Sequence, residues 1–117
     1  MRVIVCGGRD YSDTDKLSEV LNEVLLTCDD ELVIIQGGAS GADRLAERWA
    51  QARGLTVRTY RALWGQYGKR AGPIRNQRMV DEGRPDLVVS FPGGRGTADM
   101  VRRAHAAGLP VREVELS

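Results

Sequence analysis

The sequence reads Val3-Ile4-Val5-Cys6-Gly7-Gly8 near its start, an apolar run that ends in a pair of glycines. Two further units share this design. In the first, Leu32-Val33-Ile34-Ile35 precedes Gly37-Gly38. In the second, Leu87-Val88-Val89-Ser90-Phe91 precedes Gly93-Gly94. Nearly continuous apolar runs of this length are typical of strands that are buried on both faces of a sheet. The sequence therefore predicts three central strands, each followed by a glycine corner.

The segments between these strands have the apolar spacing of amphipathic helices. We expect helices over residues 13–26, 42–54, 73–82 and 97–107, a long loop over residues 61–72, and further strands over residues 56–60 and 111–114. The two further strands alternate apolar and charged residues, which indicates positions near the edges of the sheet. This order predicts an α/β fold: a single three-layer domain over residues 1–117, with a five-stranded, mostly parallel sheet and helices on both faces.

Charge and composition exclude several classes of protein. The chain has 117 residues with 17 Lys and Arg against 16 Asp and Glu, so its net charge is only +1. We therefore expect no general attraction to nucleic acid or to an anionic membrane. No apolar run approaches the roughly 20 residues that a membrane span needs. Two cysteines cannot make a disulfide framework or a four-ligand zinc site, which favours a reduced, cytoplasmic setting.

Familiar catalytic and cofactor motifs are absent. No glycine is followed by Lys and a hydroxyl residue, so there is no P-loop, and no stretch completes the dinucleotide pattern G-x-G-x-x-G. Gly38-Ala39-Ser40-Gly41-Ala42 is one residue away from a nucleophile elbow, but the only histidine, His105, falls late in a helix, away from the strand ends. With no Cys/His cluster at ligand spacing, we expect no metal and no separate cofactor.

The glycine corners are the main signal for a ligand. Open α/β sheets bind ligands at the carboxyl ends of their strands, so three such corners favour one shared cleft, with Arg9 at its rim. Pro92-Gly93-Gly94-Arg95-Gly96-Thr97 resembles a phosphate cradle, because small residues and a helix N-terminus favour an anion. Arg75 lies in the expected first turn of the third helix, where a cation is disfavoured unless an anion lies in front of it.

Two features allow both a structural and a functional interpretation. Ser40 and Asp43 have the spacing of a capping box, as do Ser12 and Asp15, yet Asp43 is also suited to bind ribose hydroxyls. Trp64 stands in the long loop, which also carries cations. It either anchors that loop onto the domain or stacks on a base as part of a lid.

Four stretches carry a family resemblance: Cys6–Gly8, Gly37–Asp43, Gly72–Met79 and Phe91–Met100, which read CGG, GGASGAD, GPIRNQRM and FPGGRGTADM. Together they resemble the SLOG superfamily, and most closely its YspA-like group of YpsA-related domains. The resemblance implies a Rossmann-like sheet that binds a nucleotide or a nucleotide-derived molecule. Relatives range from Lonely Guy phosphoribohydrolases to DNA-processing proteins and sensors of NAD-derived signals.

The Lonely Guy enzymes cleave the N-glycosidic bond of nucleoside monophosphates with a phosphate cradle, an Arg and a Glu. By this resemblance, Arg75 matches the Arg and the residues Gly93, Gly94, Gly96 and Thr97 match the cradle. The Glu position is Met100, and Asp99 lies one residue earlier, which rotates its carboxylate by about 100° around the helix. Because Met can neither activate water nor stabilise positive charge, the resemblance supports binding more than hydrolysis.

The sequence is thus interpreted as that of a protein that binds a nucleotide or an ADP-ribose- or NAD-like ligand, as a sensor or a sequestering protein. A phosphoribohydrolase and a single-stranded nucleic-acid module are the alternatives. The expected partners are a nucleotide-derived small molecule and further copies of the chain, in a homodimer or higher homo-oligomer. The candidate catalytic residues are Arg75 and Asp99. The candidate ligand-binding residues are Gly7, Gly8, Arg9, Gly37, Gly38, Ala39, Ser40, Asp43, Trp64, Arg75, Asn76, Pro92, Gly93, Gly94, Arg95, Gly96 and Thr97.

Overall fold

The computed structural model describes residues 1–116 and contains one five-stranded parallel sheet. The strands are β1 (Arg2–Cys6), β2 (Val33–Gln36), β3 (Thr56–Thr59), β4 (Leu87–Ser90) and β5 (Val111–Glu113). Their order in the sheet is β3-β2-β1-β4-β5, so the three apolar runs are central and the two alternating runs are the edges, as predicted. The winding direction changes between β1 and β4, which is where open sheets of this kind form a crevice.

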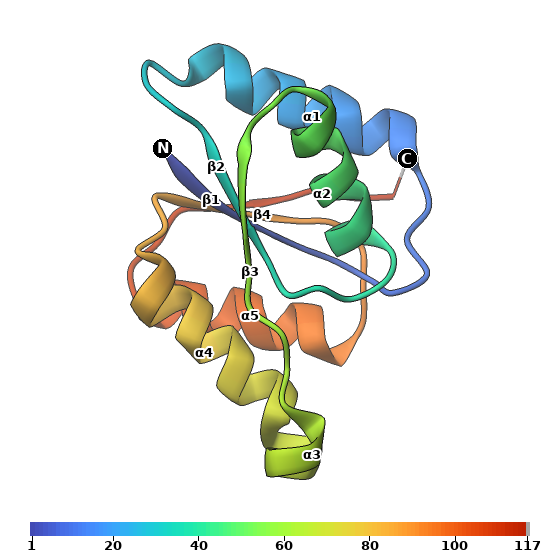
Figure 1. Cartoon of the computed structure of the whole chain (residues 1–117), viewed down its shortest axis with the longest axis vertical. Helices are drawn as coiled ribbons and strands as arrows, with labels where there is room; N and C mark the ends of the chain where they lie inside the picture. The colour runs from blue at the N-terminus through green and yellow to red at the C-terminus, as the bar shows by residue number, and fades with distance from the viewer. Residues whose placement is uncertain (117) are drawn as a thin grey trace.

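Helices cover both faces of the sheet (Figure 1). They are α1 (Thr14–Thr27), α2 (Ala42–Ala52), α4 (Ala71–Gly83) and α5 (Arg95–Ala106), with a short α3 (Trp64–Tyr67) and a 3₁₀ turn, η1 (Gly68–Arg70), before α4. Alternation along β1 explains the two layers. Val3 and Val5 pack into the core that α1 and α2 cover, whereas Ile4 and Cys6 pack against α4 and α5 on the opposite face. The predicted three-layer α/β architecture is confirmed.

The connection from β3 to α4 differs from the long loop expected over residues 61–72. Most of it is helical, because α3 and η1 fill residues 64–70 and α4 already begins at Ala71. Pro73 is therefore the third residue of α4, where its missing N–H is one of those a helix start leaves unpaired. In Figure 1, α3 extends beyond α4 at the bottom of the molecule. A four-residue helix is too short to have a repeating apolar pattern, so α3 could not be predicted from the sequence.

The two expected capping boxes are also corrected. The N-cap of α1 is Asp13, whose carboxylate accepts a hydrogen bond from Lys16 N at 3.0 Å, so Ser12 does not cap this helix. The N-cap of α2 is Gly41, with φ of 76° and no side-chain cap. The side chains of Ser40 and Asp43, which were expected to form the second capping box, make other hydrogen bonds instead.

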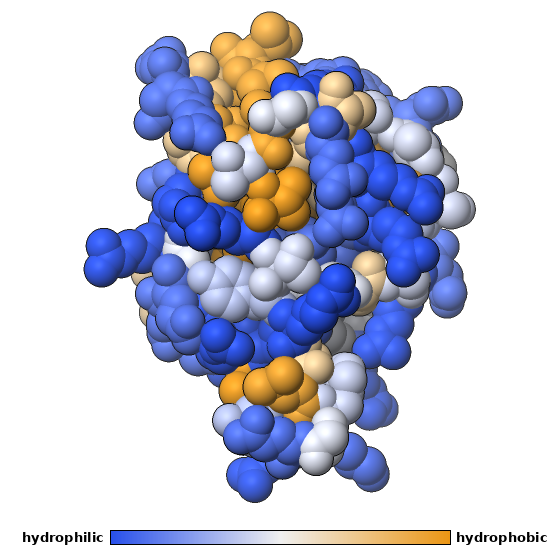
Figure 2. All heavy atoms as spheres, in the orientation of Figure 1, coloured by the Kyte–Doolittle hydropathy of each residue, from blue (hydrophilic) through white to orange (hydrophobic). Residues whose placement is uncertain are grey.

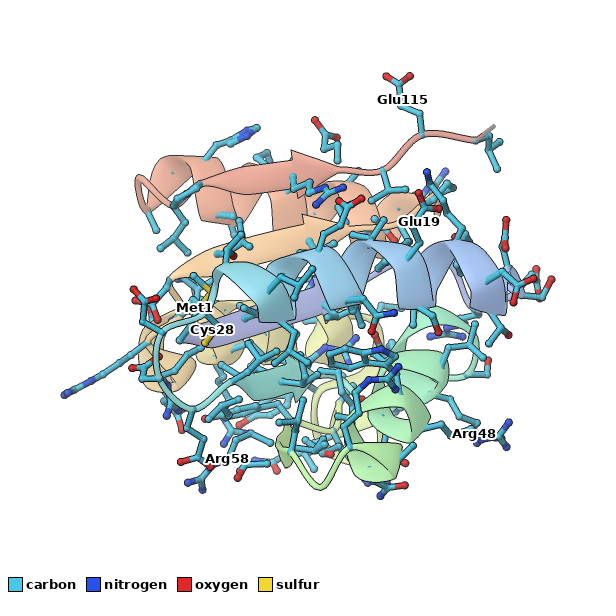
Figure 3. All side chains as sticks on the ribbon, turned by 90° about the horizontal axis from the view of Figure 1, so that it is seen from above. Met1, Glu19, Cys28, Arg48, Arg58 and Glu115 are labelled. Atoms are coloured by element: carbon cyan, nitrogen blue, oxygen red, sulfur yellow. The ribbon has the colours of Figure 1, made fainter. Side chains whose placement is uncertain are left out.

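At the amino-terminal edge of the sheet, Met1 is hydrogen-bonded to the loop that precedes β2. The Met1 ammonium donates to Asp30 Oδ1 at 2.7 Å and to the Glu31 carbonyl at 2.8 Å. Met1 and Cys28 lie side by side there (Figure 3), and both pack against the core. Within residues 1–116 no helix is long and apolar enough to cross a membrane.

Candidate functional site

The three glycine corners meet at the carboxyl edge of the sheet. Gly8 N donates to the Pro92 carbonyl at 2.9 Å, and Ala42 N donates to the Gly8 carbonyl at 3.2 Å. A Cβ atom on Gly7 would lie 2.6 Å from Ala42 Cβ and 2.9 Å from Phe91 Cβ, closer than such atoms approach in proteins. The β1 corner therefore packs between the other two only because it lacks side chains.

A cleft of about 780 Å³ opens at this junction. The candidate residues on its wall are Gly7, Gly8, Arg9, Ala39, Asp43, Trp64, Arg75, Asn76, Gly94, Arg95, Gly96 and Thr97. The candidates Gly37, Gly38 and Ser40 line an adjoining hollow that shares Arg9, Ala39, Trp64 and Arg75 with the cleft. Pro92 and Gly93 lie instead on the far side of the β4–α5 corner. The geometry thus brings most of the candidate set to one place.

The β4–α5 corner presents free backbone donors to the cleft. The N-cap of α5 is Gly94, and no side chain among the described residues caps this helix. Counting from the N-terminus of α5, the first backbone N–H with a hydrogen-bond acceptor is that of Ala98, which donates to the Gly94 carbonyl. A Cβ atom on Gly94 or Gly96 would meet nothing within 4 Å, so both positions border open space. Gly93 is different, because its Cβ would collide with the Thr97 hydroxyl. The positive end of the α5 dipole therefore lies bare at the cleft wall.

Arg75 joins α4 to the β2–α2 corner. Its Nη1 donates to the Gly37 carbonyl at 2.8 Å, and its Nε donates to Asn76 Oδ1 at 3.0 Å. Burial lowers the pKa of the guanidinium, and the nearby Asp43 carboxylate opposes that shift. Because α4 begins at Ala71, Arg75 lies in the second turn of the helix, so the expected conflict with the helix dipole in the first turn is wrong. Its place on the cleft wall comes from the contact with Gly37.

Asp43 closes the β2–α2 corner. Its side chain is buried, and Oδ2 accepts hydrogen bonds from the backbone N–H groups of Gly37 and Ala39, both at 3.2 Å. Burial raises the pKa of this carboxyl, against the opposing effect of those N–H groups and of Arg75. Ser40 donates to the Arg9 carbonyl at 3.2 Å instead of forming a capping box. Asp43 thus lies on the cleft wall with one oxygen held by the backbone.

Asn76 ties α4 to α5 from a buried position with 4% of its surface exposed. Besides accepting from Arg75, it donates through Nδ2 to the Gly96 carbonyl at 3.1 Å and to Asp99 Oδ2 at 3.0 Å. The side chain that the sequence suggested as a ligand contact is therefore engaged inside the protein. The Asn76 side chain thus links Arg75 to the first turn of α5 through hydrogen bonds.

Asp99 is also held by several partners. Its Oδ1 accepts from Arg102 at 2.7 Å, and its Oδ2 accepts from Arg103 at 2.8 Å and from Asn76. Burial acts to raise the pKa of Asp99, but the hydrogen bonds from Arg103 and Asn76 outweigh it, so the pKa lies below its ordinary value. Met100, one residue on, is completely buried in the core under α4 and α5. An ionised, fully paired carboxylate cannot donate a proton, and Met100 does not reach the cleft.

Trp64 stands at the mouth of the cleft, with 49% of its surface exposed. The Arg9 guanidinium carbon lies 5.8 Å from the centre of its ring, within the range of a cation–π contact. The lobe formed by α3 carries an apolar patch at the bottom of Figure 2, and Leu63 and Tyr67 are its other large exposed apolar side chains. The rest of the Trp64 ring is covered and lies against Gly72 at the start of α4, so Trp64 packs against the domain and also leaves part of its ring open at the cleft.

The cleft wall carries more positive than negative side chains. The basic ones are Arg9, Lys69, Arg75, Arg95 and Arg102, and the acidic ones are Asp43 and Asp99. The sequence pattern missed Arg102, although its helical spacing from Arg95 places both on one side of α5. It also missed Cys6, at the floor, where burial raises the thiol pKa to about 12. No group of His, Cys, Asp and Glu in the described part of the chain could hold a metal ion.

Comparison with known proteins identifies the family and supports the fold. The family model described as YspA, cpYpsA-related SLOG family matches residues 1–67. The Gene 61 protein of Mycobacterium phage D29 is 38% identical over an alignment 117 positions long, which covers 94% of this chain and 93% of that protein. The X-ray structure of TM1055 superposes with a TM-score of 0.68 at 22% identity, over 94% of this chain and 71% of that one, and supports the Rossmann-like fold alone. With a matching family model, and a relative this similar over nearly its whole length, the chain belongs to the YspA, cpYpsA-related SLOG family.

Proposed function

We propose that this protein binds a nucleotide, or a nucleotide-derived molecule of the ADP-ribose or NAD kind, in the cleft at the carboxyl edge of its sheet. Membership of the SLOG family suggests a nucleotide-related function. The observation that carries the proposal is the meeting of three glycine corners at one cleft. The wall of that cleft presents free N–H groups of α5 and carries five basic side chains but only two acidic ones. Such a cleft suits an anion with a polar, hydroxyl-bearing body.

The parts of the ligand can be assigned by chemistry. Phosphate suits the bare N-terminus of α5 together with Arg75, because both supply positive charge and N–H donors. Ribose suits Asp43, whose second oxygen has no protein hydrogen bond among residues 1–116 and can accept from hydroxyls. The base suits Trp64, whose exposed ring and neighbouring Arg9 offer a stacking surface.

The state of the candidate acid Asp99 favours binding over hydrolysis. Cleavage of an N-glycosidic bond needs a carboxylate free to activate water or to stabilise a developing positive charge. Asp99 is instead paired with two arginines and Asn76, and the position of the enzymes' Glu is the buried Met100. We therefore propose a receptor or a sequestering protein for a nucleotide signal.

The first test is native mass spectrometry of freshly purified protein, followed by calorimetric titration with AMP, ADP and ADP-ribose. Arg75→Ala and Gly94→Asp are each expected to abolish binding while the protein stays folded, because one removes a phosphate donor and the other places a carboxylate at the phosphate. The matched control is Arg48→Ala, since Arg48 is an exposed arginine on α2 that points away from the body of the molecule (Figure 3). Unchanged affinity in both cleft variants would refute the placement.

The two alternative functions have their own readouts. Release of free base from AMP, lost in Asp99→Asn, would establish a phosphoribohydrolase in place of a receptor. Oligonucleotide binding that weakens steeply with salt would establish a nucleic-acid module. We expect neither, since Asp99 is fully paired and the net charge is only +1.

A further inference from the structure

A second hollow, of about 510 Å³, lies across the β4–α5 corner from the cleft. Its wall includes the apolar side chains Phe91, Val101 and Val114 and the polar side chains His105 and Glu113. This volume lies within the range of ligand sites in proteins. None of the three ligand parts assigned above uses this hollow, so it is free for another group.

The hollow and the cleft share one wall. Gly94, Thr97, Ala98 and Arg102 line both of them. The first three are small residues, and the wall between the two spaces consists mostly of the first turn of α5. A phosphate bound to the free N–H groups of that turn would therefore lie on the boundary, with one hollow on each side.

Arg102 supplies a charged donor at this boundary. Its side chain is 71% exposed and is held at one end by the hydrogen bond from Nη2 to Asp99 Oδ1. Its remaining N–H groups have no partner among the described residues, so they are available to a phosphate on the boundary. A ligand with two phosphates can thus use the start of α5 and Arg102 together.

The second hollow differs from the cleft in its chemistry. Within residues 1–116 the Glu113 carboxylate takes part in no hydrogen bond or ion pair, and no basic residue other than Arg102 and His105 lines the hollow. A carboxylate repels further phosphate but accepts hydrogen bonds from hydroxyls. Apolar walls beside an acceptor of this kind suit the ring of a sugar, whose one face is apolar and whose edge carries hydroxyls.

We propose that the ligand carries a hydroxyl-bearing sugar on each side of its phosphates, and that Glu113 binds the hydroxyls of the second sugar. A nucleoside joined to another sugar through a pyrophosphate is the chemical class that fits. The nucleoside occupies the cleft, the pyrophosphate lies over the start of α5 by Arg102, and the second sugar occupies the hollow of Glu113. This inference rests on the proposed function and deepens it, because it assigns a separate site, the hollow of Glu113, to a second sugar of the ligand.

The test is the ratio of the dissociation constants of ADP and ADP-ribose, which differ by the second sugar. We expect the wild-type protein to bind ADP-ribose at least tenfold more tightly than ADP. Glu113→Gln removes the charged acceptor and Val101→Trp fills the hollow, so each is expected to bring the ratio to about 1. Glu115→Gln is the matched control, because Glu115 projects away from the molecule and is expected to keep the wild-type ratio (Figure 3).

Each result separates this inference from the proposed function. A wild-type ratio near 1 with measurable ADP binding would overturn the second-sugar site and leave the nucleotide site standing. A ratio that stays at tenfold in both Glu113→Gln and Val101→Trp would also overturn it. If neither ADP nor ADP-ribose binds at all, the proposed function fails and the present inference falls with it.

Discussion

Replacing Gly96 with alanine separates folding from ligand binding. Gly96 is the second residue of α5, its φ lies outside the left-handed region, and an added Cβ would meet nothing within 4 Å. Alanine at a compatible helical position stabilises a protein by about 0.4–1 kcal/mol, mainly by restricting the unfolded chain. With an unfolding entropy of roughly 2 cal/mol/K per residue, this corresponds to a rise in Tm of about 2–4 °C. The free space that admits the methyl group is the space assigned to phosphate.

The Gly96→Ala variant should therefore be more stable and bind more weakly. We expect ADP affinity to fall at least tenfold, because the methyl group holds the phosphate away from the N–H groups of α5. Differential scanning calorimetry measures the first effect and isothermal titration the second. Gly65→Ala is the matched control, since Gly65 is a helical glycine in α3 with open space around it and does not line the cleft. Wild-type affinity in Gly96→Ala, or equal weakening in Gly65→Ala, would refute the assignment of phosphate to this corner.

Three further predictions concern the framework of the site. Asn76→Ala removes the three hydrogen bonds of a buried side chain, so it should lower the free energy of unfolding by about 3 kcal/mol in denaturant titrations and should also weaken nucleotide binding. Asn22→Ala, the matched loss of an asparagine far from the cleft, should leave nucleotide affinity unchanged. Gly41→Ala should cost more than about 3 kcal/mol by the same measurement, because φ is 76° and the new Cβ would overlap neighbouring backbone; a cost below 1 kcal/mol would contradict the corner packing. Because the pKa of Cys6 is raised to about 12, only Cys28 should react with a disulfide reagent in the folded protein at pH 8, and two thiols should react after unfolding; two reactive thiols in the native state would contradict the burial of Cys6.

The sequence was informative where one physical cause dominated. An apolar strand that ends in two glycines has few alternatives to a buried parallel strand and a tight corner, so the three central strands and the meeting of their corners could be anticipated. Arg75 was predicted from its helix position and the family resemblance, and Trp64 from the long loop over residues 61–72. Arg75 does not lie in the first turn of its helix as predicted, because α4 starts two residues before Pro73. A helix start depends on the loop before it as much as on its own residues.

The parts of the site that sequence could not predict depend on contacts between distant residues. The bonds of Asp43 run back to the corner that precedes it, whereas a capping box would have used Ser40. Asn76 and Asp99 lie 23 positions apart, and only the packing of α4 against α5 brings them together. These contacts change the chemistry of Asp99. Its carboxylate, which the sequence suggested as a catalytic acid, is held in the structure by hydrogen bonds from Asn76 and two arginines.

The charges that remain in the cleft give a physical reason for the proposed binding of a ligand. Burial lowers the pKa of Arg75 and raises that of Asp43, so each charged form is less favourable in the folded protein than in water. The two groups oppose each other's shift, yet no salt bridge joins them in the described part of the chain, and one oxygen of Asp43 is held by backbone N–H groups. For Asp43 the raised pKa means that stability falls as the pH rises through it, so the ionised group is a cost at neutral pH. A phosphate beside Arg75 and hydroxyls on Asp43 would compensate both charges at once, and the free energy gained would appear as ligand affinity and as a higher Tm.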